Sequence, residues 1–90
     1  MWRLPPGARG RRHAERAQEE VFVVLEGTLT MLFGDTPDRV RIGPGGVAAV
    51  KPGCPIQLRN ESDAEVLVFV YGAPPVADDA ELLDEIEPDS

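Results

Sequence analysis

The stretch that most constrains this chain runs from Gly7 to Gly27 and reads GARGRRHAERAQEEVFVVLEG. His13 and Glu15 are two residues apart, so in an extended segment both side chains leave the same face. A strand that begins at Glu20 follows after four residues, and we expect the gap to be a hairpin that places the two strands side by side. The imidazole and the two carboxylates then converge on one point. A nitrogen with two carboxylates is a donor set that divalent cations accept.

The rest of the chain alternates short apolar runs with turns rich in Gly and Pro. Strands are expected at residues 2–4, 11–15, 20–26, 28–33, 39–42, 47–50, 56–59 and 65–71. Short strands at this spacing, separated by turn residues, are typical of an antiparallel barrel or jelly roll. The predicted fold class is therefore all-β, an antiparallel β-barrel or jelly roll.

The C-terminal segment has a different composition and predicts a short helix. Asp78 can cap a helix, and Glu81, three residues later, completes a capping box. A small apolar stripe follows, made of Leu82, Leu83 and Ile86. The predicted domain organisation is a single barrel over residues 1–77 and an acidic tail with this helix over residues 78–90.

The net charge of −7 comes from the tail. Residues 1–77 hold nine basic and nine acidic side chains, and residues 78–90 add seven acids. Residues 1–77 thus carry no net charge and the whole chain is acidic. A protein that binds nucleic acid needs a basic face, so a nucleic-acid partner is not expected. The arginines near the N-terminus are expected either to be solvated, or to hold an anion or pair with the acidic tail.

Apolar runs and cysteine usage restrict the location. No run approaches the ~20 apolar residues that cross a bilayer, so no membrane span is expected. The first twelve residues lack the apolar core of a secretory signal. The single cysteine, Cys54, cannot form an internal disulfide, which favours a reducing compartment. We therefore expect a cytoplasmic protein.

The first stretch resembles the first signature of the cupin family: a glycine, five residues, His-x-His, four residues, a glutamate, six residues and a glycine. Gly7, His13, Glu20 and Gly27 stand at the matching positions, and Glu15 replaces the second histidine. The resemblance implies a small single-domain cupin barrel, in agreement with the strand pattern.

The second cupin signature has a counterpart between Gly45 and Asn60. Gly45, Gly53 and Asn60 match it, Lys51 stands where a proline is usual, and Ile56 stands where the third histidine ligand belongs. Seven of ten signature positions are thus kept at unbroken spacing, but two of the four that carry the family's metal ligands have changed. The resemblance therefore implies a degenerate metal site.

The candidate metal ligands are His13, Glu15 and Glu20, an incomplete set. They suit a divalent transition metal, with Mn, Fe or Ni favoured over a structural Zn, or the site holds no metal. Two structural alternatives stay open: His13 as an ordinary satisfied residue, and Glu20 either hydrated at the barrel mouth or salt-bridged to Arg59 or Arg41. Glu20 is also the candidate catalytic residue, as a general base.

Three functions are consistent with these residues. The favoured one is a binding module that takes up a small molecule in the barrel, with a weakened or absent metal site. The alternative is a metal-dependent cupin enzyme, an oxygenase, isomerase or lyase acting on a small metabolite. The second alternative is a structural or regulatory dimeric subunit that binds a larger protein through its tail. The residues expected to line the ligand cavity are Phe22, Val24, Met31, Phe33, Ile56 and Leu58.

The strand over residues 20–26 is apolar on both faces. Phe22 and Val24 point with Glu20, whereas Val21 and Val23 point the other way. An apolar outer face needs a cover, either another subunit or a second packed sheet, and a ninety-residue chain has a thin core of its own. A homodimer is therefore expected.

Overall fold

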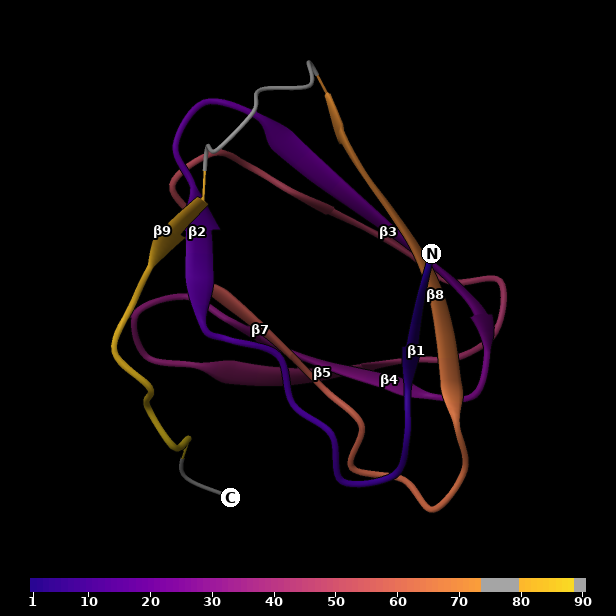
Figure 1. Cartoon of the computed structure of the whole chain (residues 1–90). Coiled ribbons are helices and arrows are strands. Elements are labelled where there is room, and N and C mark those ends of the chain that lie inside the picture. The colour runs from indigo at the N-terminus through magenta and orange to yellow at the C-terminus, as the bar shows by residue number, and fades with distance from the viewer. Residues whose placement is uncertain (74–79, 89–90) are drawn as a thin grey trace.

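The computed structural model describes residues 1–73 and 80–88, and within these residues the regular structure is all β (Figure 1). The strands, in chain order, are β1 (Trp2–Leu4), β2 (His13–Glu15), β3 (Glu19–Glu26), β4 (Leu29–Phe33), β5 (Asp38–Ile42), β6 (Val47–Val50), β7 (Ile56–Arg59), β8 (Val66–Ala73) and β9 (Ala80–Leu82).

The strands form two antiparallel sheets. The four-stranded sheet has the order β1-β8-β3-β6, and the five-stranded sheet has the order β5-β4-β7-β2-β9. In Figure 1, β2 and β9 lie on one side and β1 and β8 on the other, around a common interior that side chains fill. The expected all-β class is confirmed, and the antiparallel strands are arranged in two sheets.

The hairpin expected between β2 and β3 is wrong. β2 pairs with β7 and β9, whereas β3 pairs with β6 and β8 in the other sheet. β4 likewise pairs with β5 and β7 and not with β3. Alternation could not reveal this, because a strand keeps the same inward face whether its neighbour in sequence lies beside it or in the opposite sheet.

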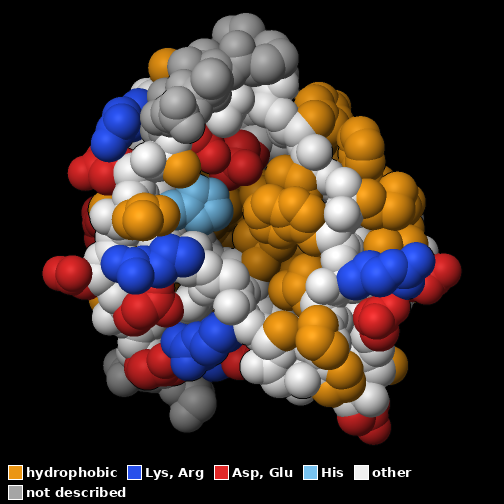
Figure 2. All heavy atoms as spheres, viewed as in Figure 1, with side chains coloured by type: hydrophobic (Ala, Val, Ile, Leu, Met, Phe, Trp, Pro, Cys, Tyr) orange, Lys and Arg blue, Asp and Glu red, His pale blue; other side chains and the backbone are white. Residues whose placement is uncertain are grey.

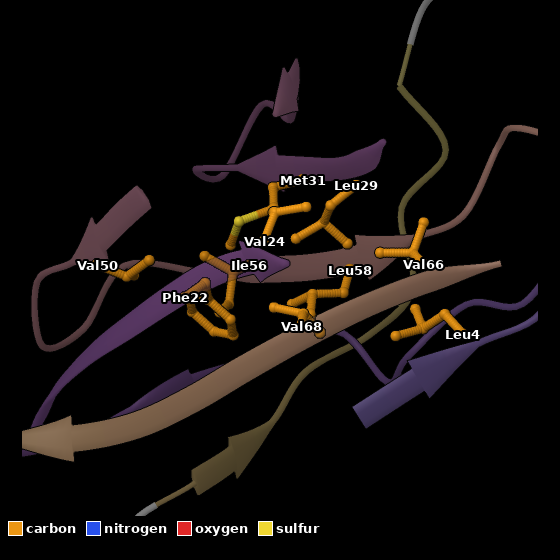
Figure 3. Close-up of a cluster of buried hydrophobic side chains, with 10 residues drawn as sticks. All are labelled: Leu4, Phe22, Val24, Leu29, Met31, Val50, Ile56, Leu58, Val66 and Val68. Carbon is orange, nitrogen blue, oxygen red and sulfur yellow. The ribbon is translucent and has the colours of Figure 1, made fainter. Parts of the chain in front are cut away.

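The hydrophobic core lies between the two sheets, and both contribute to it (Figure 3). Alternate residues of β3 and β8 meet alternate residues of β4 and β7, as expected for a sandwich of two half-buried sheets. The buried members are Leu4, Phe22, Val24, Leu29, Met31, Val50, Ile56, Leu58, Val66 and Val68.

The predicted C-terminal helix is wrong for the described part of the tail. Ala80–Leu82 is strand β9, and residues 83–88 have no regular secondary structure. The expected cap, Asp78, lies outside the described residues. Leu82 is 64% exposed and Leu83 is half-buried, so the two residues do not form the buried stripe of a packed helix. Local helix propensity is a weak preference, and here the free edge of β2 offers the segment backbone hydrogen bonds instead. None of the described segments forms a helix long and apolar enough to cross a membrane.

Candidate metal site

The three sequence-predicted ligands come from both sheets and meet at one end of the interior. His13 and Glu15 lie on β2, and His13 faces Ile56 of β7 on the inner side of the five-stranded sheet. Glu20 lies on the inner side of the four-stranded sheet, where it is opposite Val50 of β6. The alternation of each strand thus directs all three side chains inward, although the strands do not pair with each other.

One donor atom from each of His13, Glu15 and Glu20 lies within 4.8 Å of the others. His13 Nε2 is 3.2 Å from Glu20 Oε1 and 3.9 Å from Glu15 Oε1. All three side chains are largely buried, with 12%, 11% and 9% of their surface exposed. The chemistry and spacing of this donor set fit a divalent cation, which would take the place of a proton on Nε2.

The backbone fixes the orientation of the imidazole. His13 Nδ1 is 3.0 Å from the carbonyl oxygen of Arg11. A carbonyl can only accept, so Nδ1 carries a hydrogen and donates it. Nε2 is therefore the nitrogen that faces the carboxylates. A ligating histidine in proteins is commonly held in this way, by a hydrogen bond from its other ring nitrogen.

The metal-free cluster favours a protonated imidazole. The hydrogen bond to Glu20 raises the pKa of His13 above its ordinary value, and the bond to the Arg11 carbonyl and the two nearby carboxylates act in the same direction against the effect of burial. When protonated, the ring donates from Nε2 to Glu20 at 3.2 Å. Metal binding has to displace this proton, so the affinity for a cation rises with pH.

A cavity of about 340 Å³ opens beside the cluster. In Figure 2 the histidine and neighbouring acidic side chains border a hollow whose other wall is hydrophobic. The cavity therefore combines a polar donor cluster with an apolar surface, the usual character of a small-molecule site. The lining residues are Trp2, Gly10, Arg11, His13, Glu15, Glu20, Leu58, Ala80 and Leu82.

The six predicted ligand-lining residues are mostly core. Phe22, Val24, Met31 and Ile56 are at most 1% exposed and pack between the sheets, and Phe33 packs against them. Leu58 also belongs to the core and is the one of the six that lines the 340 Å³ cavity. The structure therefore brings the three predicted metal ligands together, and places most of the predicted ligand wall in the packed interior. The ligand-binding role of these six residues stays a prediction.

Several cavity residues were missed by sequence reasoning. Arg11 is two residues before His13, and the same alternation that paired His13 with Glu15 could have found it. Ala80 and Leu82 could not have been found, because the segment was expected to be helical. Trp2 gave no signal beyond its place in a short strand.

The alternative partners expected for Glu20 lie elsewhere. The guanidinium of Arg59 donates to Gln57 and Glu87, and that of Arg41 is 3.9 Å from Glu61. Glu20 pairs with His13 instead. The nearby histidine thus offsets the burial of this carboxylate, which is the main cost of placing an acid inside a barrel.

The family model of the cupin domain matches residues 1–71. Among solved structures, a protein of Thermus thermophilus is 28% identical with a TM-score of 0.71, over 78% of this chain and 65% of that one. A cupin-superfamily sugar phosphate isomerase from Silicibacter pomeroyi is 34% identical with a TM-score of 0.70, over 78% of this chain and 45% of that one.

More distant structures share the fold alone. The capsular polysaccharide assembling protein CapF from Staphylococcus aureus is 16% identical with a TM-score of 0.82, over 93% of this chain and 26% of that one. No match is found among curated proteins. The chain spans less than two thirds of the first two structures named above. The family model covers most of the chain, the donor cluster stands at the signature positions, and the fold is a two-sheet barrel. The chain therefore belongs to the cupin family.

Proposed function

We propose that this cupin binds a divalent transition metal weakly at the mouth of its barrel, and that a small molecule in the adjoining cavity completes the coordination. The observation that carries the proposal is the convergence of His13, Glu15 and Glu20 within 4.8 Å beside a cavity of about 340 Å³. Three protein donors leave coordination positions open for water or ligand. When bound, the metal supplies Lewis-acid polarisation of an oxygen on the ligand.

The cavity wall defines the class of ligand. Its volume is at the lower end of the range for small-molecule sites, so the ligand is a small metabolite. Trp2, Leu58 and Leu82 offer it an apolar surface, and the exposed Arg11 at the rim, 3.8 Å from Glu85, offers a positive charge. We therefore propose a ligand with an apolar portion and at least one anionic oxygen-bearing group.

Isothermal titration of tag-free protein with Mn²⁺, Ni²⁺ and Zn²⁺ tests the metal site. We expect one equivalent bound in the wild type and an affinity at least about tenfold lower in Glu20→Gln, since the amide keeps the shape but not the charge. Glu26→Gln is the matched control, because Glu26 is an exposed acid on the same strand. Undiminished stoichiometric binding in Glu20→Gln would contradict the assignment.

A second candidate is isomerisation of a sugar phosphate. The 34% identical structure that carries this name supports it, as does Arg11, whose guanidinium suits a phosphate at the rim of the cavity. In this chain Glu20 would act as the general base, taking a proton from the carbon next to the carbonyl and returning it to the former carbonyl carbon. His13, held on its Nδ1 side by the Arg11 carbonyl, would donate a proton to the former carbonyl oxygen and take one back from the adjacent hydroxyl, which becomes the new carbonyl.

Incubation with aldose and ketose phosphates, followed by product analysis, tests the isomerase proposal. We expect the rate to fall by about 10²–10⁴ in Glu20→Gln. Activity that survives EDTA but is lost in Glu20→Gln would assign the reaction to the carboxylate without a metal. Absence of any interconversion would remove this candidate and leave the binding function untouched.

The third function, a subunit that recruits a partner through its acidic tail, has less support. Glu85 and Glu87 of the tail are paired with arginines of their own chain. A cytoplasmic location remains part of the proposal and is supported by Cys54, which is free.

A further inference from the structure

Strand β2, which carries two of the three donor residues, is held mainly by the C-terminal segment. β2 and β7 share a single register pair, His13 with Ile56, whereas β2 and β9 share three. Beyond β9, the amide of Leu83 donates to the carbonyl of Arg12 at 3.0 Å. The segment formed by residues 80–88, which we call the strap, therefore supplies most of the backbone pairing of β2.

Glu85 is the strap residue whose side chain bonds to the backbone of Arg12, the residue before β2. One of its carboxylate oxygens accepts from the backbone N–H of Arg12 at 2.8 Å, and the other accepts from the side chain of Gln57 on β7. Gln57 is 1% exposed and also donates to the carbonyl of Gly10 at 2.9 Å. Glu85 thus joins the residue before His13 to the neighbouring strand and to the segment that leads into β2.

One peptide unit connects Glu85 to the imidazole. The Arg12 N–H that donates to Glu85 and the Arg11 carbonyl that accepts from His13 Nδ1 belong to the same peptide bond. A peptide bond is planar, and in its trans form the N–H and C=O groups point in opposite directions. Fixing the N–H outward on Glu85 therefore fixes the carbonyl that orients the ring of His13.

We infer that Glu85 is a positioning residue for the donor cluster, acting through the Arg11–Arg12 peptide to hold His13 and Glu15 toward Glu20. The inference rests on the proposed metal site for its functional meaning. Outer groups that orient a metal ligand typically change metal affinity by about 10–100-fold when they are removed. Glu85 is more distant, since it acts through a peptide unit, so we expect the lower end of this range.

Metal titration and amide hydrogen exchange on the full chain, both on purified variants, test the inference. Glu85→Ala is expected to lower Ni²⁺ or Mn²⁺ affinity about tenfold and to speed exchange at His13, Ala14 and Glu15, whose strand loses its anchor. Glu85→Gln keeps an oxygen that can accept from Arg12, so it should recover much of both effects. It also keeps the test valid if the alanine variant folds poorly.

Two controls separate positioning from general docking of the strap. Glu87→Ala removes an acid from the same strap but breaks contacts only with Arg9 and Arg59, away from the Arg11–Arg12 peptide. Glu65→Ala breaks an exposed ion pair with Arg3 in the other sheet. Both should leave metal affinity within about threefold of the wild type.

Three results would overturn the inference: unchanged exchange at β2 in Glu85→Ala, faster exchange with unchanged metal affinity, or an equal loss of affinity in Glu87→Ala. Failure of the wild type to bind any of the metals would instead remove the proposed function. The exchange measurement would then still decide whether Glu85 holds β2.

Discussion

Ile56 lies directly opposite His13 on the β2–β7 pair, with its side chain 1% exposed in the core. The cupin signature has a histidine at this position, and the register explains why: directly opposite side chains on one face of a sheet are about 5 Å apart. The isoleucine side chain contributes to the hydrophobic core but cannot coordinate a metal. The site consequently has three donors and an apolar side chain where a fourth would stand.

Ile56→His should therefore restore a ligand. We expect the affinity for Ni²⁺ or Zn²⁺ to rise at least about tenfold, and the metal-free free energy of unfolding to fall by about 1–3 kcal/mol, because a polar ring replaces buried hydrocarbon. Titration calorimetry and urea unfolding measure the two effects.

Val66→His is the matched control for this substitution. Val66 is equally buried but lies six residues along β8 from Gly72, the partner of Glu20, which is about 20 Å of strand. Val66→His should lower the free energy of unfolding about as much as Ile56→His does, without raising the metal affinity. An unchanged affinity in Ile56→His would show that the opposed position does not reach the cluster.

Gly27 illustrates a signature residue with a backbone role. It has a φ of 77°, and a Cβ there would lie 2.5 Å from the carbonyl oxygen of Glu65, where the chain crosses between the sheets. Gly45 has a φ of 84° with nothing within 4 Å of its own Cβ position. Comparing the two separates conformational strain from steric overlap.

Gly45→Ala should lower the free energy of unfolding by about 1–2 kcal/mol, the cost of a left-handed conformation for an L-residue. Gly27→Ala carries the same strain plus a clash with backbone, so we expect a loss of about 3 kcal/mol or more. Urea unfolding monitored by the fluorescence of Trp2 measures both. Equal losses would show that β8 moves aside without cost.

At the scale of elements, the strands could be predicted from the sequence more readily than their partners. Gly and Pro turns and alternation are local signals, and they placed the first eight strands within a few residues of β1 to β8. Pairing across the two sheets is not local, which is why the hairpin between β2 and β3 was wrong even though its ligands do converge. β9 was missed because the capping pattern at Asp78 and Glu81 predicts a helix. Groups that are distant in sequence, the edge of β2 and the N-terminal arginines, favour the extended conformation instead.

Two arginines, Arg59 of β7 and Arg9 near the N-terminus, make the strap sensitive to acid. Hydrogen bonds from Arg59 and Arg9 lower the pKa of Glu87 from its ordinary value of 4.5 to about 2. A depressed pKa in the folded state means that the ionised carboxylate stabilises the fold above pH 4.5. This contribution is lost as the pH falls from 4.5 towards 2.

Glu87→Gln should therefore flatten the stability profile in this window. The urea midpoint of the wild type is expected to fall more steeply than that of the variant between about pH 4.5 and pH 2, and the two to differ by a constant amount above about pH 5. The side chain of Glu87 is 66% exposed, so the difference should be small and should shrink in high salt. Parallel profiles throughout the window would contradict the pairing.

At the scale of the whole molecule, the outer faces of the two sheets differ in character. The strap covers the five-stranded sheet, where Gln57 and Arg59 are buried on the outer side of β7. The four-stranded sheet instead presents an apolar outer face, formed by alternate residues of β3, β6 and β8 (Figures 1 and 2). Its members include Val21, Val23, Val47, Phe69 and Tyr71.

This face suits a second copy of the same chain. Phe69 is 41% exposed and Tyr71 46% on the central strand β8, so the middle of this face presents hydrophobic side chains to solvent. Its rim carries both signs of charge, with Arg3 and Glu65 paired at one edge and Lys51 and Glu19 at the other. In a two-fold symmetric dimer the same surface of both copies is in contact, so a rim that carries both signs of charge can be complementary to the rim of the second copy. The burial would also extend the thin core of a ninety-residue chain.

We therefore predict a homodimer, and a charge at the centre of the face should split it. Sedimentation equilibrium of the wild type should give about twice the chain mass of 9.8 kDa, and Phe69→Glu should give the monomer, because an unpaired carboxylate would be buried between the copies. Val40→Glu on β5 is the control, since Val40 is 42% exposed on the other sheet, just as Phe69 is 41% exposed on this one. A monomeric wild type, or a dimeric Phe69→Glu, would leave the apolar face without the partner proposed for it.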